Sequence, residues 1–243
     1  MLSTKFFGPT ILFVSIFALG IPAHADTIQV TGITEPYNRV DLGFPDAGII
    51  HVENFQEGDS VKKGDVILEL DKNLEAIEVT RTEAIMTQNK TVYESTLQLF
   101  QSTKSVSQED LDKSAAEYHV AAAQYQTAVQ QLANRQLIAP FSGTITEMPY
   151  KPGAVVAPYV PFVQLVDSSR CYFRGNVDGI TASKLQLDES VQIQLQGGET
   201  VSGKICYISP IVDPASGLAR IKAIFDNTDG KIRPGVSATL TAN

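Results

Sequence analysis

The stretch NLEAIEVTRTEAIMTQNKTVYESTLQLFQSTKSVSQEDLDKSAAEYHVAAAQYQTAVQQLANRQ, residues 73–136, interrupts a sequence repeat. The same pattern of glycines and apolar residues occurs before and after it, and every matched pair is 95 residues apart without a gap. The pairs are Gly48/Gly143, Ile50/Ile145, Gly58/Gly153, Val61/Val156, Leu68/Val163 and Leu70/Leu165. Because a repeat of this kind marks a duplicated structural unit, the sequence predicts one small β module in two halves, residues 43–72 and 137–168.

The insertion has the pattern of two long helices that fold back on each other. The first, residues 73–102, contains no Pro or Gly, and its apolar residues follow an approximate heptad stripe: Leu74, Ile77, Ala84, Ile85, Val92 and Leu99. The second has a regular 4-3 stripe that predicts a coiled-coil seam: Leu111, Ala115, Tyr118, Ala122, Tyr125, Val129 and Leu132. Ser107 and Asp110 have the spacing of a capping box at its start. Helices of this length reach roughly 45 Å.

Both stripes are narrow and rich in Ala, and the remaining faces are mostly Gln, Thr, Ser, Asn, Glu and Lys. A helix that covers a large core has a wider apolar face. We therefore interpret residues 73–136 as a projecting antiparallel coiled-coil hairpin. The alternative is an ordinary amphipathic helix pair that packs on a globular core.

The N-terminal residues 1–25 have the features of an export signal. Lys5 precedes an apolar run over residues 11–21, and Ala23-His24-Ala25 is a small-x-small cleavage pattern. We expect a mature protein that begins at Asp26 outside the cytoplasm; the alternative is an uncleaved N-terminal anchor. Residues 26–42 are expected to form an N-terminal strand segment.

Residues 169–243 contain several short strand patterns between turn signals, which predict a small antiparallel β-barrel. The expected strands are 171–177, 191–195, 201–209, 218–225 and 236–241, with a short helix over 180–187. A generic β-sandwich is the alternative. Cys171 and Cys206 both lie in expected strands, so that a disulfide between them and two free thiols both remain open.

Composition argues against several classes of function. The net charge of −8 disfavours nucleic acid as a partner. Beyond the expected signal only His51 and His119 remain, and neither has a carboxylate or Cys at metal-ligand or triad spacing. We therefore predict no catalytic residue, metal site or cofactor.

Several segments resemble one known family. EGDSVKKGDVILELD (57–71) is similar to the first half of a lipoyl/biotinyl-type sandwich, and IAPFSGTI (138–145) with KPGAVVAPYVPFVQLVD (151–167) is similar to the second. GKICYISPIVDPASGLARIKAIFDN (203–227) and GKIRPGVSATL (230–240) are similar to a barrel. Together they resemble the periplasmic adaptor subunits of efflux systems, the membrane fusion proteins of the HlyD and RND type. The resemblance implies an α+β multidomain chain: a split barrel-sandwich hybrid, an inserted helical hairpin and a β-barrel.

The resemblance also implies a function. Such an adaptor joins an inner-membrane transporter, here expected to be of the RND type, to an outer-membrane channel, and contributes to the export of small molecules. Copies of the chain associate side by side, commonly six of them, and no reaction is catalysed. The family's docking motif at the hairpin tip falls on Thr96, Phe100 and Ser107 in this sequence. Since the sequence stops at Asn243, we expect a short form that lacks most of the membrane-proximal domain.

Two other functions are weighed against the adaptor. A lipoyl or biotinyl carrier would use Lys72 of LELDKNLEA (68–76) as its modified lysine. A carrier lysine needs the tip of a tight β-turn, and the helical insertion removes that turn. A purely structural coiled-coil protein explains the heptads, but it explains neither the split repeat nor the barrel.

Overall fold

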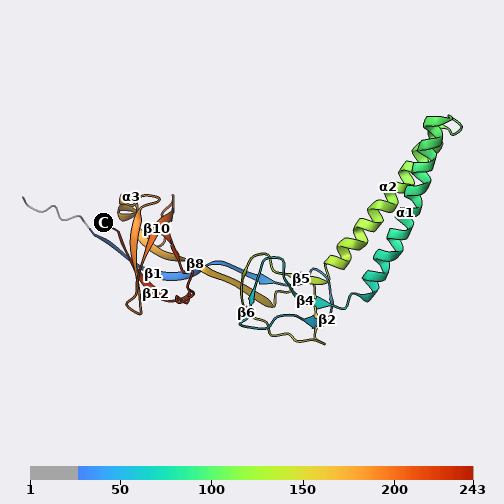
Figure 1. The fold of residues 1–243 in the computed structure, drawn as a ribbon. Coiled ribbons are helices and arrows are strands. Elements are labelled where there is room, and N and C mark those ends of the chain that lie inside the picture. Colours follow the sequence, from blue (N-terminus) through green and yellow to red (C-terminus); the bar gives the residue numbers. More distant parts are fainter. Residues whose placement is uncertain (1–26, 243) are drawn as a thin grey trace, which may run out of the picture.

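The computed structural model describes residues 27–242, which form a β-barrel, a β-sandwich and a two-helix hairpin in a row (Figure 1). The expected signal peptide therefore lies outside the described residues. The sandwich occupies the middle of the molecule and joins the other two units.

The two halves of the repeat form the sandwich. The first half contains β2 (Gly48–Glu53), β3 (Ser60–Val61) and β4 (Val66–Leu70). The second half contains β6 (Gly143–Glu147), β7 (Val155–Val156) and the start of β8 (Val163–Asp178), while β5 (Gln136–Ile138) pairs with β4. Each half gives its two-residue strand to the other half, because β3 pairs with β6 and β7 pairs with β2.

The pairing between the halves is reciprocal down to single hydrogen bonds. Gly58 donates its N–H to the Ile145 carbonyl at 2.8 Å, and Gly153 donates to the Ile50 carbonyl at 2.8 Å. The apolar residues of the repeat all lie in one buried cluster, to which Phe44, Ile67 and Met148 also belong. The predicted split module is therefore confirmed.

Two long strands run through both the sandwich and the barrel. β1 (Ile28–Leu42) pairs antiparallel with β8 along most of its length. The register shifts between Pro36 and Asn38, where Tyr37 stacks on Tyr172 with ring centroids 5.6 Å apart. β8 continues without interruption across the domain boundary that was expected after residue 168. Its first residues pack in the core of the sandwich, and its later residues pack in the core of the barrel.

The barrel has six strands in a closed order, β1-β12-β9-β10-β11-β8, with β1 paired to β8. Its remaining elements are α3 (Gly179–Lys184), β9 (Ser190–Leu195), β10 (Thr200–Ile208), β11 (Leu218–Asp226) and β12 (Ser237–Ala242). Alternate residues of these strands point inward, as a half-buried strand requires, and form a second buried cluster around Phe173, Ile193 and Ile221. The predicted barrel is confirmed and the generic sandwich is wrong.

The hairpin consists of α1 (Asn73–Ser102) and α2 (Gln108–Ala133), and it projects from the sandwich without packing on the barrel (Figure 1). In α1 only Thr82 is buried. Such a small buried surface is consistent with two helices that pack on each other and face solvent elsewhere. The projecting hairpin is confirmed, and the pair packed on a globular core is wrong.

The seam of α2 differs in register from the predicted one. Its buried residues are Leu111, Ser114, Ala121 and Ala128. Among the predicted seam residues, those only half-buried are Ala115, Tyr118, Ala122, Tyr125 and Leu132, and Val129 is 40% exposed. Small residues at every seventh position let the helices approach closely. The sequence prediction chose Val129 over Ala128 because Val is the more hydrophobic residue. In the structure Ala128 is buried in the seam and Val129 lies on the surface, so this part of the prediction is wrong.

Most of the predicted stripe of α1 lies beside the seam with α2 and not in it, although Ile85 is half-buried. Its side chains are largely exposed: Leu74 78%, Ile77 66%, Val92 47% and Leu99 47%. The side toward α2 is marked instead by Tyr93, which stacks on Tyr118 with centroids 5.9 Å apart, and by the buried Thr82. The apolar stripe was therefore correctly located in sequence but wrongly assigned to the intramolecular seam.

Candidate functional site

The hairpin tip is a short turn between two capped helix ends. The Thr103 N–H donates to the Leu99 carbonyl at 3.0 Å and ends α1. The Ser107 hydroxyl accepts from the Asp110 N–H at 3.1 Å, and the Ser107 N–H donates to the Asp110 carboxylate at 3.4 Å, which is the predicted capping box. The Ser107 hydroxyl also donates to the Asp110 carboxylate at 2.6 Å, and this hydrogen bond together with that from the Ser107 N–H holds the pKa of Asp110 below its usual value. The tip is thus fixed by local hydrogen bonds.

The three residues predicted for docking occupy different environments at this tip. Thr96 and Phe100 are half-buried and lie three and seven residues after Tyr93, on the side of α1 that faces α2. The Thr96 hydroxyl also donates to the Val92 carbonyl at 2.8 Å. Ser107 is exposed but its hydroxyl belongs to the cap. The residue of this end that presents an aliphatic side chain outward is Leu99, which the motif comparison did not select.

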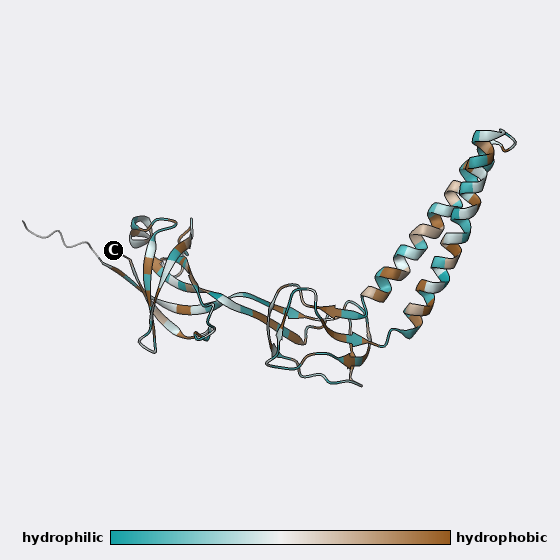
Figure 2. Ribbon diagram, in the orientation of Figure 1, coloured by the Kyte–Doolittle hydropathy of each residue, from teal (hydrophilic) through white to brown (hydrophobic). Residues whose placement is uncertain are grey.

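The exposed aliphatic stripe of α1 consists of Leu74, Ile77, Val92 and Leu99, and we call it the outer stripe. Brown segments recur along α1 in Figure 2, from the base of the hairpin to its tip. The surface of α1 thus has three sides: the side toward α2, the outer stripe and a polar side. This is the pattern of a helix that packs against two neighbours. One of these neighbours is α2, and the outer stripe is exposed to solvent in the described chain.

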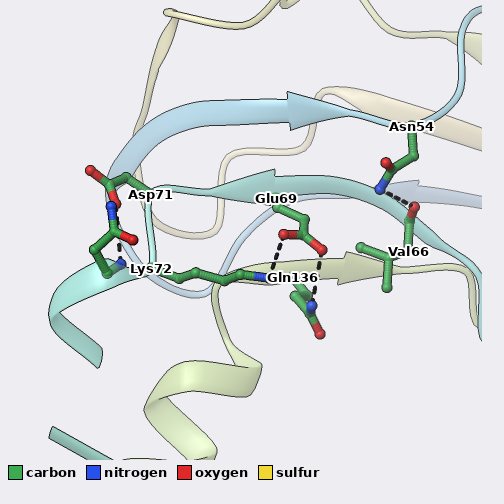
Figure 3. A network of polar contacts seen from close by, with 7 residues as sticks. Asn54, Val66, Glu69, Asp71, Lys72 and Gln136 are labelled. Carbon is green, nitrogen blue, oxygen red and sulfur yellow. Dashed lines mark hydrogen bonds and ion pairs between the residues drawn. The ribbon is translucent and has the colours of Figure 1, made fainter. Parts of the chain in front are cut away.

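The base of the hairpin is tied to the sandwich by polar contacts (Figure 3). Glu69 on β4 accepts from the Lys72 ammonium and from the Gln136 amide, the latter at 3.0 Å. The hydrogen bond from Lys72 lowers the pKa of Glu69. Asp71 accepts from the Asn73 N–H at 3.1 Å at the start of α1. These contacts set the direction in which the two helices leave the sandwich.

A second set of polar contacts joins the bases of both helices to the residues just before β2. Arg135, just after α2, donates to the Glu75 carboxylate at 2.6 Å and to the Ala47 carbonyl at 2.8 Å. The side chains of Arg135 and Glu75 are only 20% and 18% exposed, so that water screens this ion pair less than a surface pair. Asn134 also donates to Asp46 at 3.1 Å. These contacts fix the base of the hairpin to the sandwich, so that we call it a braced hairpin.

Lys72 lies in a setting unlike that of a carrier lysine. It occupies the N-cap position of α1, at the foot of the hairpin, and its ammonium is paired with Glu69. A lysine that carries a swinging arm needs an exposed turn between the two half-motifs, and 64 residues of helical insertion occupy that place here. The geometry disfavours the carrier alternative.

The two cysteines are free, and the disulfide alternative is wrong. Cys171 on β8 points into the barrel, whereas Cys206 on β10 is exposed at a register shift. β11 lies between these strands, so that their backbones are about 10 Å apart, beyond the roughly 7 Å that a disulfide spans. Burial raises the pKa of Cys171 to about 11 and also raises the pKa of Cys206.

Within residues 27–242, no group of three or more His, Cys, Asp or Glu side chains is placed to hold a metal ion. No helix in this range combines the length and apolar character needed to cross a membrane. What the described chain offers is a set of surfaces: the tip, the outer stripe and the barrel exterior.

Comparison with known proteins decides the family. Residues 38–160 match the description "RND MFP, barrel-sandwich hybrid domain", and residues 176–243 match "CusB-like, beta-barrel domain". The chain belongs to the RND membrane fusion protein family. Proteins of this family are adaptors of efflux systems, and the fold predicted from the two half-motifs is that of the family.

Two curated proteins match parts of the chain at 27% identity. An uncharacterised protein of Haemophilus influenzae is 27% identical over 216 residues, which are 88% of this chain and 56% of that protein. The nodulation protein NolF of Rhizobium meliloti is 27% identical over 109 residues, 44% of this chain and 30% of NolF. The chain thus spans about half or less of the length of these relatives.

Among solved structures, a MacA–MexA chimera with the Pseudomonas aeruginosa MexA α-hairpin domain superimposes with a TM-score of 0.76. The sequences are 19% identical, and the alignment covers 89% of this chain and 80% of the chimera. This likeness concerns the fold: sandwich, hairpin and barrel follow one another in the same way.

Proposed function

We propose that this protein is a periplasmic adaptor that links an inner-membrane efflux transporter of the RND type to an outer-membrane channel. The observation that carries the proposal is the braced hairpin, which projects from the sandwich and ends in a short capped tip (Figure 1). An arm with so little buried surface of its own is suited to contact other proteins. The adaptor takes part in the export of small molecules and catalyses no reaction.

The two ends of the molecule would contact different partners. The tip would meet the periplasmic end of the channel, and the barrel would face the transporter. The expected export signal at residues 1–25 supports a periplasmic location. The protein would then be peripheral to the inner membrane and be held there through its transporter.

The outer stripe supports self-association. Four exposed aliphatic side chains along one side of α1 have no partner within the described chain. An unpartnered heptad face of this kind fits a helix of a second copy, so that hairpins would stand side by side as staves of a tube. Six copies are expected from the family resemblance.

Deletion of residues 90–120, with a short Gly linker in their place, tests the docking role. This variant keeps the base contacts of Glu69, Arg135 and Glu75. We expect a folded protein that no longer restores export in a strain without the native gene. A variant that unfolds, or one that still supports export, would contradict docking through the tip. Leu99→Ser is the finer test, with Gln98→Ser as its control on the polar side.

A further inference from the structure

One end of the barrel carries a cluster of exposed aliphatic side chains that no other contact explains. We call it the aliphatic tip: Ile180 76% exposed, Ile211 74%, Val212 45% and Leu218 37%. The α3 helix and the loop over residues 209–217 lie side by side there, because a Cβ added to Gly179 would be 3.2 Å from the Val212 side chain. Single exposed aliphatic residues are ordinary, but a cluster on neighbouring loops marks a contact surface.

The aliphatic tip lies at the end of the barrel that is farthest from the hairpin. Leu218 pairs with Asp178, directly before α3, and Ile28 pairs with Ala242 at the same end. Figure 1 shows α3 and the C-terminus on the side of the barrel away from the sandwich. If the protein is the proposed adaptor, whose hairpin points to the outer membrane, this end faces the inner membrane.

Cationic and aromatic side chains follow the aliphatic tip along the barrel wall. The outward residues of β11 are Leu218, Arg220 and Lys222 in turn, at steps of about 7 Å. Lys222 lies over the Tyr172 ring at 5.5 Å and has Tyr207, 42% exposed, opposite it on β10. Arg174 lies opposite Lys222 on β8, but it is paired with Glu35 at 2.9 Å. Among the described residues neither Arg220 nor Lys222 forms an ion pair. A hollow of about 480 Å³ is lined by Ile211 and Leu218 of the aliphatic tip together with Tyr207, Arg220 and Asp213.

This order matches the depth profile of a bilayer surface. Aliphatic side chains that protrude from loops enter the boundary of the acyl chains, while Tyr, Arg and Lys lie at the level of the headgroups. Two carboxylates at this end, Asp178 and Asp213, accept hydrogen bonds from the backbone amides of their own loops. We propose that the aliphatic tip and the cations behind it dock on an anionic phospholipid bilayer.

Vesicle flotation tests this docking with the protein that lacks residues 1–25, the expected mature form. The probes are vesicles of phosphatidylethanolamine with phosphatidylglycerol, and vesicles of phosphatidylcholine alone. We expect binding to the anionic vesicles, and a loss of about tenfold or more in Ile180→Ser/Ile211→Ser. Arg220→Gln/Lys222→Gln should lower binding to the anionic vesicles only. Ile49→Ser/Val155→Ser is the matched control, because these side chains are 52% and 74% exposed on the sandwich and have no assigned contact.

The outcomes separate this inference from the proposed function on which it rests. Absence of binding by the native protein, or equal binding by the Ile180→Ser/Ile211→Ser variant, overturns the membrane contact. If that variant loses export although the native protein does not bind vesicles, the aliphatic tip contacts a protein, which also overturns it. The deletion of residues 90–120 should leave vesicle binding intact while it abolishes export. Export that persists in the deletion would instead count against the adaptor function alone.

Discussion

The turn glycines Gly58 and Gly153 hold matching positions in the two halves of the sandwich. Their φ angles are +94° and +92°, a conformation that side chains with a Cβ resist. No atom lies within 4 Å of a Cβ added at either position, so that conformation and not space requires glycine there. Each also donates the hydrogen bond that ties its half to the other half. The duplicated module thus depends on the same backbone feature twice.

We expect Gly58→Ala and Gly153→Ala to lower the free energy of unfolding by similar amounts, about 1–2 kcal/mol each. Gly197→Ala is the control, because Gly197 also has open space around it but no positive φ. Urea unfolding measures all three. Equal stability of the three variants would contradict the conformational explanation.

The two thiols should differ in reactivity. Both thiols have raised pKa values and are protonated at about pH 8, so that alkylation is slow. We expect slow labelling of the exposed Cys206 in the native protein, and labelling of Cys171 only after unfolding. Cys206→Ser should abolish native labelling. A protein purified under oxidising conditions with no free thiol in denaturant would restore the disulfide alternative.

At the scale of elements, the α1–α2 seam depends on small residues at close approach. Ala121 is 3% exposed, whereas Ala123, two residues later, is exposed. Ala121→Leu should overpack the seam and lower the free energy of unfolding by about 1–3 kcal/mol. Ala123→Leu should leave it nearly unchanged. Thermal unfolding followed by circular dichroism compares the two variants, and an equal effect would mean that the seam has another register.

The base of the hairpin should respond to acid through Glu69. Its pKa is lowered because Lys72 donates to the ionised carboxylate, so that the pair stabilises the fold above the ordinary Glu pKa of about 4.3. This stabilisation should disappear as the pH falls below the ordinary Glu pKa and through the lowered pKa of Glu69. We expect the difference in unfolding free energy between native protein and Glu69→Gln to shrink over that range, by less than about 1 kcal/mol because water screens the pair. Lys72→Met should give the same profile as Glu69→Gln, and a profile parallel to that of the native protein would contradict the pairing.

Elements that obey a strong local rule could be predicted from the sequence. The split repeat was visible because Gly58 and Gly153 each need a rare backbone conformation, and the cap at Ser107 because its spacing is specific. The register of the seam could not be predicted, because a pattern of alternating steps of three and four residues that starts at Leu111 can place either Ala128 or Val129 next to α1. Hydrophobicity selects Val129, while the distance between the helices selects the smaller residue. The same ambiguity placed the outer stripe inside the hairpin.

At the scale of the whole molecule, three units divide the contacts among them. β1 and β8 join barrel and sandwich by continuous hydrogen bonding, and the base contacts of Arg135 join sandwich and hairpin. Each connection therefore fixes the orientation of one unit relative to the next. A lipid contact at the barrel and a protein contact at the hairpin tip would then orient the protein between two membranes. The sequence could not reveal the aliphatic tip, because Ile180, Ile211 and Leu218 come together only in the fold.

The outer stripe is the surface through which we propose that copies of the chain associate, and this contact can be tested directly. We expect Ile77→Glu/Val92→Glu to weaken self-association at least about tenfold, or about 1.4 kcal/mol, because each substitution would bury a charge between neighbouring hairpins. Folding should be unaffected, since Ile77 and Val92 are 66% and 47% exposed in the single chain. Thr87→Glu/Gln98→Glu adds the same charge on the polar third side of α1 and should leave association unchanged. Sedimentation velocity over a range of concentrations compares the variants. If both pairs behave like the native protein, the copies do not associate through α1, and the outer stripe must contact a different partner.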